Sequence, residues 1–272
     1  MLGQANDIYD LEIKLGEIPL ESFLYHSRNN DFSRWLYSLA EVELAANVRA
    51  LRDEDFDSPE LHRQHLIKMI KTQRMVRQKG VIVNFDKDRF DPDTEFLKIG
   101  NGSLGGKARG LAFFSAMLHR NSDLLKQFAN VEISVPQTFV LTTESFDSFI
   151  EHNSLEELVK EDLPDEVISD HFSRSEFPEA IVSELTVFLK NIDYPLAVRS
   201  SSLLEDAQFK SYAGLYHTCI VANDHPDNEC RLSQLLYAIK TVYASTYYRA
   251  PKSFTQRVGN KTENEKMAVI IL

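Results

Sequence analysis

The sequence predicts an α+β protein in which a mostly helical segment, residues 1–95, precedes a mixed domain, residues 96–272. In the first segment, apolar residues recur at the three- and four-residue spacing of helices. After residue 96, short apolar runs typical of strands alternate with such helical patterns, an arrangement found in both α/β and α+β domains. A chain of 272 residues can form one large or two ordinary domains with apolar cores.

Composition excludes several classes of protein. With 43% hydrophobic and 26% charged residues, the chain has the composition of an ordinary globular protein. A formal net charge of -11 argues against general nucleic-acid binding, because that partner favours a basic surface. Cys219 and Cys230 lack metal-binding spacing, and no apolar run approaches the roughly 20 residues of a membrane span. Since no basic and apolar leader begins the chain, we expect a cytoplasmic protein without a membrane or nucleic-acid partner, and we assign no metal ligand.

Two helices are predicted with definite starting points in the first segment. Asp31 can cap a helix that continues through Val42, and Ser58 with Pro59 can begin a second one. The second helix carries His62, Arg63, His65, Lys68, Lys71, Arg74, Arg77 and Lys79. For this cationic face we expect a solvated surface, or a docking surface for an acidic partner, rather than a nucleic-acid site. The two histidines lack a nearby cysteine or acidic pair, so we do not assign them a metal.

A polar, proline-containing connector, residues 86–93, follows a predicted strand at residues 81–85, and we place the domain boundary there. Beyond the connector, a strand is predicted at residues 137–141. Either Thr142 or Thr143 can then cap the following helix.

A glycine-rich stretch, residues 100–111, is the first candidate site. It follows a predicted strand at 96–99 and leads into a predicted helix, so its glycines can bring backbone amides close to an anion, and Lys107 adds positive charge. The spacing of Gly100, Gly102 and Gly105 fits the dinucleotide-binding pattern Gly-x-Gly-x-x-Gly, but the acidic residue expected about 20 residues later is missing. A Walker A loop is excluded, because Asn101 stands at the position of its first glycine and Ala108 follows the lysine where serine or threonine is needed. Two interpretations remain, a phosphate-binding lid of another type and a glycine turn with a surface lysine.

The second candidate site follows a predicted strand at residues 195–198. Arg199 comes at its end, with the hydroxyl residues Ser200, Ser201 and Ser202 directly after it. A guanidinium offers a planar fork of donors that suits phosphate oxygens. An ion pair of Arg199 with Glu205 or Asp206 is an equally good interpretation of these residues alone.

Three further elements complete the mixed domain. Residues 212–214 permit a tight turn into a strand at 215–221, and a long amphipathic helix is predicted over 231–248. The sequence closes on an all-apolar strand, residues 267–272. We therefore expect it to be a piece of a longer chain, and association of the terminal strand into a homodimer remains open.

Four motifs occur in a fixed order along the mixed domain. They are Leu104-Gly-Gly-Lys-Ala-x-Gly-Leu111; Val135-Pro-x-x-Phe-Val-Leu-Thr-Thr-Glu144; Val198-Arg-Ser-Ser201 with Glu205-Asp206 and Ser211-Tyr-Ala-Gly214; and Met267-Ala-Val-Ile-Ile271. In this order they resemble the ATP-binding domain of the phosphoenolpyruvate synthase and pyruvate phosphate dikinase family, which includes rifampin phosphotransferase and glucan water dikinases. The resemblance covers about residues 96–272 and implies the N-terminal half of an ATP-grasp fold. Residues 1–95 lie outside it, and we interpret them as a regulatory or docking segment.

The resemblance also implies a set of site residues. Lys107 and Arg199 would contact ATP phosphates and stabilise the transferring phosphoryl group by their charge, not as acid or base. The turn at residues 211–214 would lie over the transferred phosphate, and the strand at 267–271 would border the adenine. Together the implied ATP-binding positions are Gly105, Gly106, Lys107, Arg199, Ser200, Ser201, Gly214, Ile270 and Ile271. Tyr212 and Leu215 depart from the phenylalanine and glutamine common in the family.

The implied reaction passes the β-phosphate of ATP to a histidine on a separate domain and then to pyruvate, with Mg²⁺ as cofactor. The final acceptor stays open, because some relatives phosphorylate an antibiotic or a glucan. The sequence also does not decide whether water or phosphate takes the γ-phosphate. In the family, acidic magnesium ligands follow the strand matching residues 267–271, so we expect this piece alone not to complete the reaction. The alternative is a non-catalytic nucleotide sensor whose first 95 residues signal to a partner.

Overall fold

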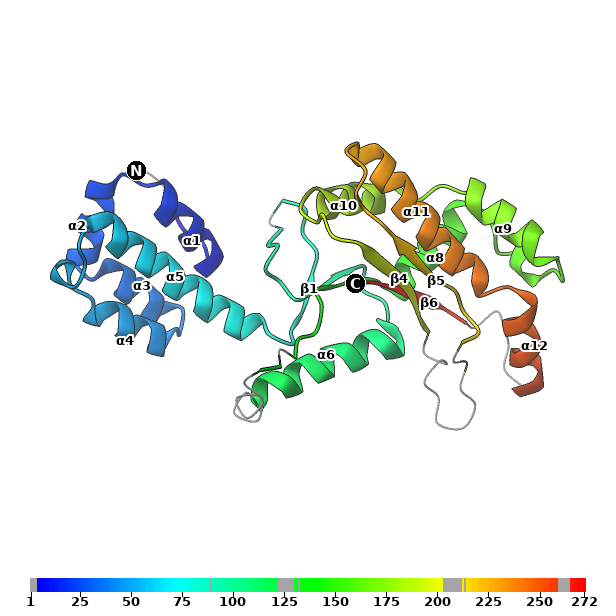
Figure 1. The fold of residues 1–272 in the computed structure, drawn as a ribbon, viewed down its shortest axis with the longest axis horizontal. Coiled ribbons are helices and arrows are strands. Elements are labelled where there is room, and N and C mark those ends of the chain that lie inside the picture. Colours follow the sequence, from blue (N-terminus) through cyan, green and yellow to red (C-terminus); the bar gives the residue numbers. More distant parts are fainter. Residues whose placement is uncertain are drawn as a thin grey trace. The chain divides into compact units, whose positions relative to one another are not determined.

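The computed structural model describes residues 4–88, 90–121, 130–131, 133–202, 212, 214–258 and 265–272. The chain divides into two compact units, a helical unit of residues 1–78 and a sheet unit of residues 79–272 (Figure 1). Within the described ranges, the helices are all too short or too polar to cross a membrane.

The helical unit packs its helices around a small apolar core. Its elements are α1 (Ile8–Glu17), α2 (Leu20–Arg28), α3 (Asp31–Ser38), α4 (Val42–Ala50), the 3₁₀ turn η1 (Asp53–Asp55) and α5 (Pro59–Gln78). The core consists of Leu11, Leu15, Phe23, Leu36, Leu44, Ala45, Leu66 and Ile70. Ser58 Oγ accepts a hydrogen bond from the Leu61 amide at 3.3 Å, which confirms the predicted serine cap of the helix that starts at Pro59.

The predicted continuous helix from Asp31 through Val42 is wrong. It ends at Ser38, and a new helix begins at Val42. Between them Ala40 adopts a left-handed backbone with φ of 61°, which a continuing right-handed helix does not allow. The apolar spacing runs on through this turn, so periodicity alone does not reveal the break.

Two arginines of the predicted cationic face of α5 form ion pairs within the helical unit. Arg74 is only 3% exposed and forms an ion pair with Glu12 at 2.9 Å, and its guanidinium lies 4.9 Å from the centre of the Tyr9 ring. Arg77 forms an ion pair with Glu41. The expectation of a solvated face is therefore wrong for Arg74, which is a paired core residue, and the charge of Arg77 is matched within the unit.

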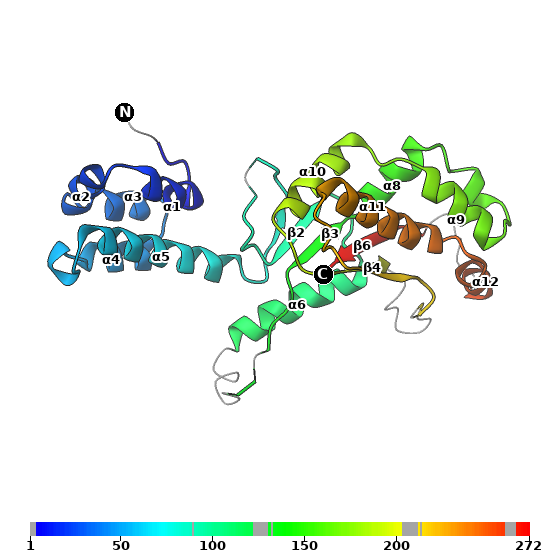
Figure 2. The ribbon, with the colours of Figure 1, turned by 45° about the horizontal axis from the view of Figure 1, so that its top comes forward.

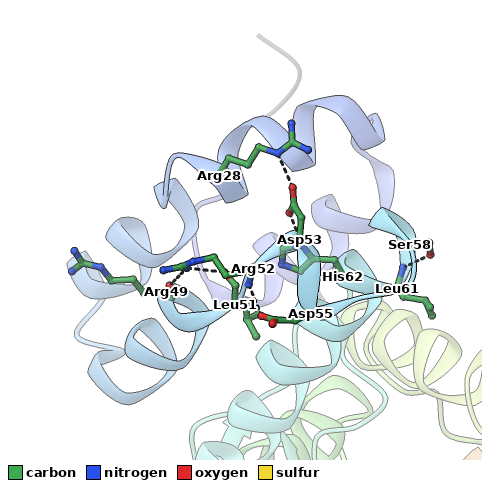
Figure 3. A network of polar contacts seen from close by, with 9 residues as sticks. All are labelled: Arg28, Arg49, Leu51, Arg52, Asp53, Asp55, Ser58, Leu61 and His62. Carbon is green, nitrogen blue, oxygen red and sulfur yellow. Dashed lines mark hydrogen bonds and ion pairs between the residues drawn. The ribbon is translucent and has the colours of Figure 1, made fainter.

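His62 is a structural residue of the same unit. Its Nδ1 lies 3.1 Å from Asp53 Oδ1, and its ring stacks on Phe56 with centroids 4.5 Å apart. Asp53 also accepts a hydrogen bond from Arg28 Nε at 2.7 Å, and this bond holds the pKa of the carboxyl group below its usual range. The network ties η1 to both α2 and α5 (Figure 3).

The sheet unit contains a six-stranded mixed sheet in the order β1-β2-β3-β6-β4-β5. Its strands are β1 (Ile82–Asn84), β2 (Phe96–Ile99), β3 (Thr138–Leu141), β4 (Leu196–Ser202), β5 (Thr218–Val221) and β6 (Met267–Ile271). The first three are parallel, whereas β6 runs antiparallel between β3 and β4, and β5 antiparallel beside β4. Because β1 pairs with β2, residues 79–95 belong to the sheet unit and not to the helical segment in which the sequence-based boundary placed them. Mixed strands and helices confirm the α+β class.

Helices cover both faces of this sheet (Figure 2). They are α6 (Gly105–Arg120), α8 (Thr143–His152), α9 (Asp165–Arg174), α10 (Glu179–Lys190), α11 (Asn228–Ser245) and α12 (Arg249–Val258), with a 3₁₀ turn η3 (Leu158–Lys160). Ala108 of α6 packs against Val140 and Ile270 on one face. The neighbouring strand residues, such as Phe139 and Ile271, point into the main core on the other face, as strand alternation requires.

Candidate nucleotide-binding site

The glycine-rich stretch forms the predicted strand, turn and helix. Strand β2 ends at Ile99 and α6 begins at Gly105. Gly105 has a φ of +73°, and a Cβ atom there would lie 1.5 Å from the carbonyl oxygen of Ser201. Only glycine fits this position, because the obstacle is backbone and the conformation is left-handed. The start of α6 therefore lies directly against β4.

Ser201 fastens the first turn of α6 to β4. Its hydroxyl donates to the Leu104 carbonyl oxygen at 2.8 Å and accepts from the Ala108 amide at 3.2 Å. The side chain is fully buried. Ser201 thus satisfies an amide of the first helical turn that has no partner within the helix.

Lys107 joins the two candidate motifs. Its Nζ lies 3.1 Å from the Ser200 carbonyl oxygen and 3.3 Å from the Ser200 hydroxyl. Lys107 is half-buried and Ser200 is buried. The ammonium group is therefore held against β4 at the residue that follows Arg199.

Arg199 is exposed on β4 and pairs in register with Ile270 of β6. Directly paired residues of neighbouring strands share a face of the sheet, so Arg199 lies on the face that α6 covers. Its guanidinium makes no hydrogen bond or ion pair with any residue that the structure describes. Glu205 and Asp206, the alternative ion-pair partners, lie outside the described residues.

Residues 101–272 match the family model described as "Pyruvate phosphate dikinase, AMP/ATP-binding domain". The chain belongs to this family. The resemblance drawn from the four motifs is thereby confirmed, and the chain carries an AMP/ATP-binding domain. It is also similar to an "Uncharacterized phosphotransferase YvkC" of Bacillus subtilis (strain 168), with 27% identity over 139 residues. That alignment covers 51% of this chain but 16% of the relative, so the chain spans a small part of its length.

The other predicted positions of the AMP/ATP-binding domain are distributed around these residues. Gly106 lies in the first turn of α6. Gly214 is exposed with a φ of +78°, but Ser211 and Ala213 of the predicted turn lie outside the described residues. The strand after this turn begins at Thr218, later than the predicted residue 215. Ile270 shares the face of Arg199, whereas the side chain of Ile271 lies in the core on the opposite face.

No metal-binding group is found in the described part of the domain. Among those residues, three or more His, Cys, Asp or Glu side chains do not come together in a way that could hold an ion. The described residues therefore contain no cluster that could hold Mg²⁺ by protein side chains alone.

Sequence reasoning assigned no site role to Thr143 and Glu144, yet both contact the glycine-rich stretch. Thr143 Oγ1 accepts from the Ser103 amide at 2.9 Å, and the Glu144 carboxylate accepts from the Asn101 amide. The predicted threonine cap is not observed, since Thr142 precedes α8 without a side-chain capping bond. The sequence carries no local signal for this contact. It arises because β2 and β3 are parallel neighbours in the sheet, so the loops after them meet at one edge.

Proposed function

We propose that the sheet unit is the ATP-binding part of a phosphotransferase resembling phosphoenolpyruvate synthase and pyruvate phosphate dikinase. In the proposed reaction, the β-phosphate of ATP passes to a histidine on a separate domain and then to pyruvate. One observation carries the proposal. The Lys107 ammonium lies 3.1 Å from the backbone of Ser200, next to the exposed Arg199, so the two motifs that resemble phosphate-binding motifs meet at one place.

Lys107 and Arg199 would bind the phosphate oxygens of ATP. A lysine fixed on a helix and an arginine fixed on a strand place positive charge before the reaction, so little reorganisation is needed as charge develops. The amides of Gly106 and Lys107 in the first turn of α6 add donors suited to an anion. Ser200 and Ser201 would hold the site together instead of contacting ATP through their hydroxyls, because both are buried and their hydroxyls contact protein groups.

An ATP-grasp fold and a Mg²⁺ ion that neutralises phosphate charge are proposals that rest on the family resemblance. The same holds for pyruvate as the final acceptor, with an antibiotic or a glucan as alternatives. A cytoplasmic location is a proposal that rests on the composition, with its two cysteines and no disulfide pattern. Incubation of the full-length protein with β-labelled ATP and each acceptor tests the choice. Label appearing in pyruvate supports the proposal, and label appearing in another acceptor, or in none, contradicts it.

The binding step is tested by titration calorimetry of ATP against the full chain. Lys107→Ala and Arg199→Ala are each expected to weaken binding by about 1.5–3 kcal/mol, the range for a lost hydrogen bond to a charged group. Arg120→Ala is a matched control, since Arg120 is an exposed cation about 20 Å further along the same helix. We expect its affinity to stay near that of the wild type. Unchanged affinity in both test variants would refute the assignment of the two residues.

A further inference from the structure

The first residues of α8 form hydrogen bonds with the loop between β2 and α6. We call residues 100–103 of this loop the glycine loop. Ser103 is bonded through both of its backbone groups, since its amide donates to Thr143 Oγ1 and its carbonyl oxygen accepts from the Thr143 amide, each at 2.9 Å. Two bonds to one residue fix both the position and the rotation of the peptide groups at Ser103.

Glu144 makes a third contact. Its carboxylate accepts a hydrogen bond from the Asn101 amide, although both residues are exposed to solvent. A carboxylate in the first turn of a helix is favoured by the helix dipole, and here it also satisfies an amide of another segment. The glycine loop is therefore bonded to α8 near both of its ends.

The two loop glycines are required by the closeness of α8. Gly100 has a φ of +84°, and a Cβ atom there would lie 2.4 Å from Thr142 Oγ1. At Gly102 a Cβ atom would lie 2.5 Å from the Glu144 amide nitrogen and 2.6 Å from Thr143 Oγ1. These glycines thus allow tight contact with α8, which orders the loop instead of leaving it loose.

We propose that Thr143 and Glu144 are positioning residues of the nucleotide site, which fix the glycine loop before ATP binds. The inference rests on the proposed function. The loop continues directly into α6, whose first turn carries Lys107. A loop that is already ordered loses less conformational entropy when ATP binds. The affinity for ATP is therefore higher than it would be with a loosely held loop.

The test uses four substitutions in the full chain. Thr143→Val and Glu144→Ala remove the acceptors, whereas Thr143→Ser and Glu144→Gln keep an oxygen in place. Glu151→Ala is the matched control, because Glu151 is exposed on α8 and its carboxylate forms no hydrogen bond or ion pair with another described residue. Titration calorimetry gives the ATP affinity, and hydrogen exchange of peptides covering residues 100–111 reports loop order without nucleotide.

We expect Thr143→Val and Glu144→Ala to weaken ATP binding by about tenfold and to speed exchange in the glycine loop. Thr143→Ser, Glu144→Gln and the control should behave like the wild type, and the melting temperature should change little in all five. Wild-type ATP affinity of Thr143→Val and Glu144→Ala, or unaltered exchange in their glycine loop, would overturn the inference while leaving the proposed function intact. Absence of ATP binding by the wild-type chain would instead refute the proposed function, and the inference with it.

Discussion

Replacing Gly105 with alanine tests the contact between α6 and β4. The new Cβ atom would lie 1.5 Å from the Ser201 carbonyl oxygen and 2.4 Å from its carbonyl carbon, so the two backbones must separate. The left-handed conformation at φ +73° costs an alanine about 1–2 kcal/mol. Separation also breaks the two hydrogen bonds of the Ser201 hydroxyl, about 1 kcal/mol each. The expected loss in the free energy of unfolding is about 3–4 kcal/mol.

Chemical denaturation followed by circular dichroism measures this loss, which corresponds to a melting temperature lower by about 10 °C. Trp35 is the single tryptophan and lies in the helical unit, so its fluorescence follows that unit. Gly110→Ala is the matched control, because nothing lies within 4 Å of its Cβ position and alanine is the better helix former by about 1 kcal/mol. Wild-type stability of the Gly105→Ala variant would refute the described packing of α6 on β4.

Two further predictions concern other parts of the molecule. The hydrogen bond from Arg28 lowers the pKa of Asp53 in the folded protein. The stability that this bond adds is therefore present above about pH 4, the pKa of an unfolded aspartate, and is lost as the pH falls through the lowered pKa of the folded state. Asp53→Asn should flatten this acid dependence in Trp35 fluorescence, and an unchanged profile would contradict the network. Tyr243 is fully buried and its hydroxyl finds no hydrogen-bond partner in the described chain, so Tyr243→Phe should raise the free energy of unfolding by up to about 1 kcal/mol. Tyr248→Phe should lower the free energy of unfolding by a similar amount, because the Tyr248 hydroxyl is hydrogen-bonded to Ser169. Equal effects of the two substitutions in denaturant melts would refute the difference between the two hydroxyls.

Local patterns in the sequence predicted most of the sheet unit. An observed strand lies within or overlaps each predicted one, because the apolar runs are short and bounded by polar or proline residues. The glycines between residues 100 and 106 likewise predicted a turn into a helix, and β2 and α6 confirm it. Strand order did not follow from these patterns. The insertion of β6 between β3 and β4 brings together segments more than 60 residues apart, and pairing at that range leaves no local signal.

The site was predicted in part. The sequence indicated Lys107 and Arg199 as separate candidates, and the contact of Lys107 with Ser200 shows that Lys107 meets β4 one residue beyond Arg199. The role of Ser201 could not be predicted from the sequence. A serine close to an arginine suggested a contact with ATP, but the Ser201 hydroxyl bonds to the first turn of α6. Either Thr142 or Thr143 was expected to cap the helix that follows, yet the hydroxyl of Thr143 bonds to Ser103 in another loop. In each case the tertiary neighbour decides the role of the hydroxyl.

Hydrogen exchange of the full chain with and without Mg-ATP, with AMP as a control, tests the central claim most directly. If the AMP/ATP-binding domain holds ATP phosphates at the meeting point of the two motifs, ATP should slow exchange in peptides covering residues 100–108 and 196–202. AMP should protect them less, because it lacks the phosphates that Lys107 and Arg199 are proposed to bind. Protection confined to the helical unit, or none in these two segments at saturating ATP, would contradict the account.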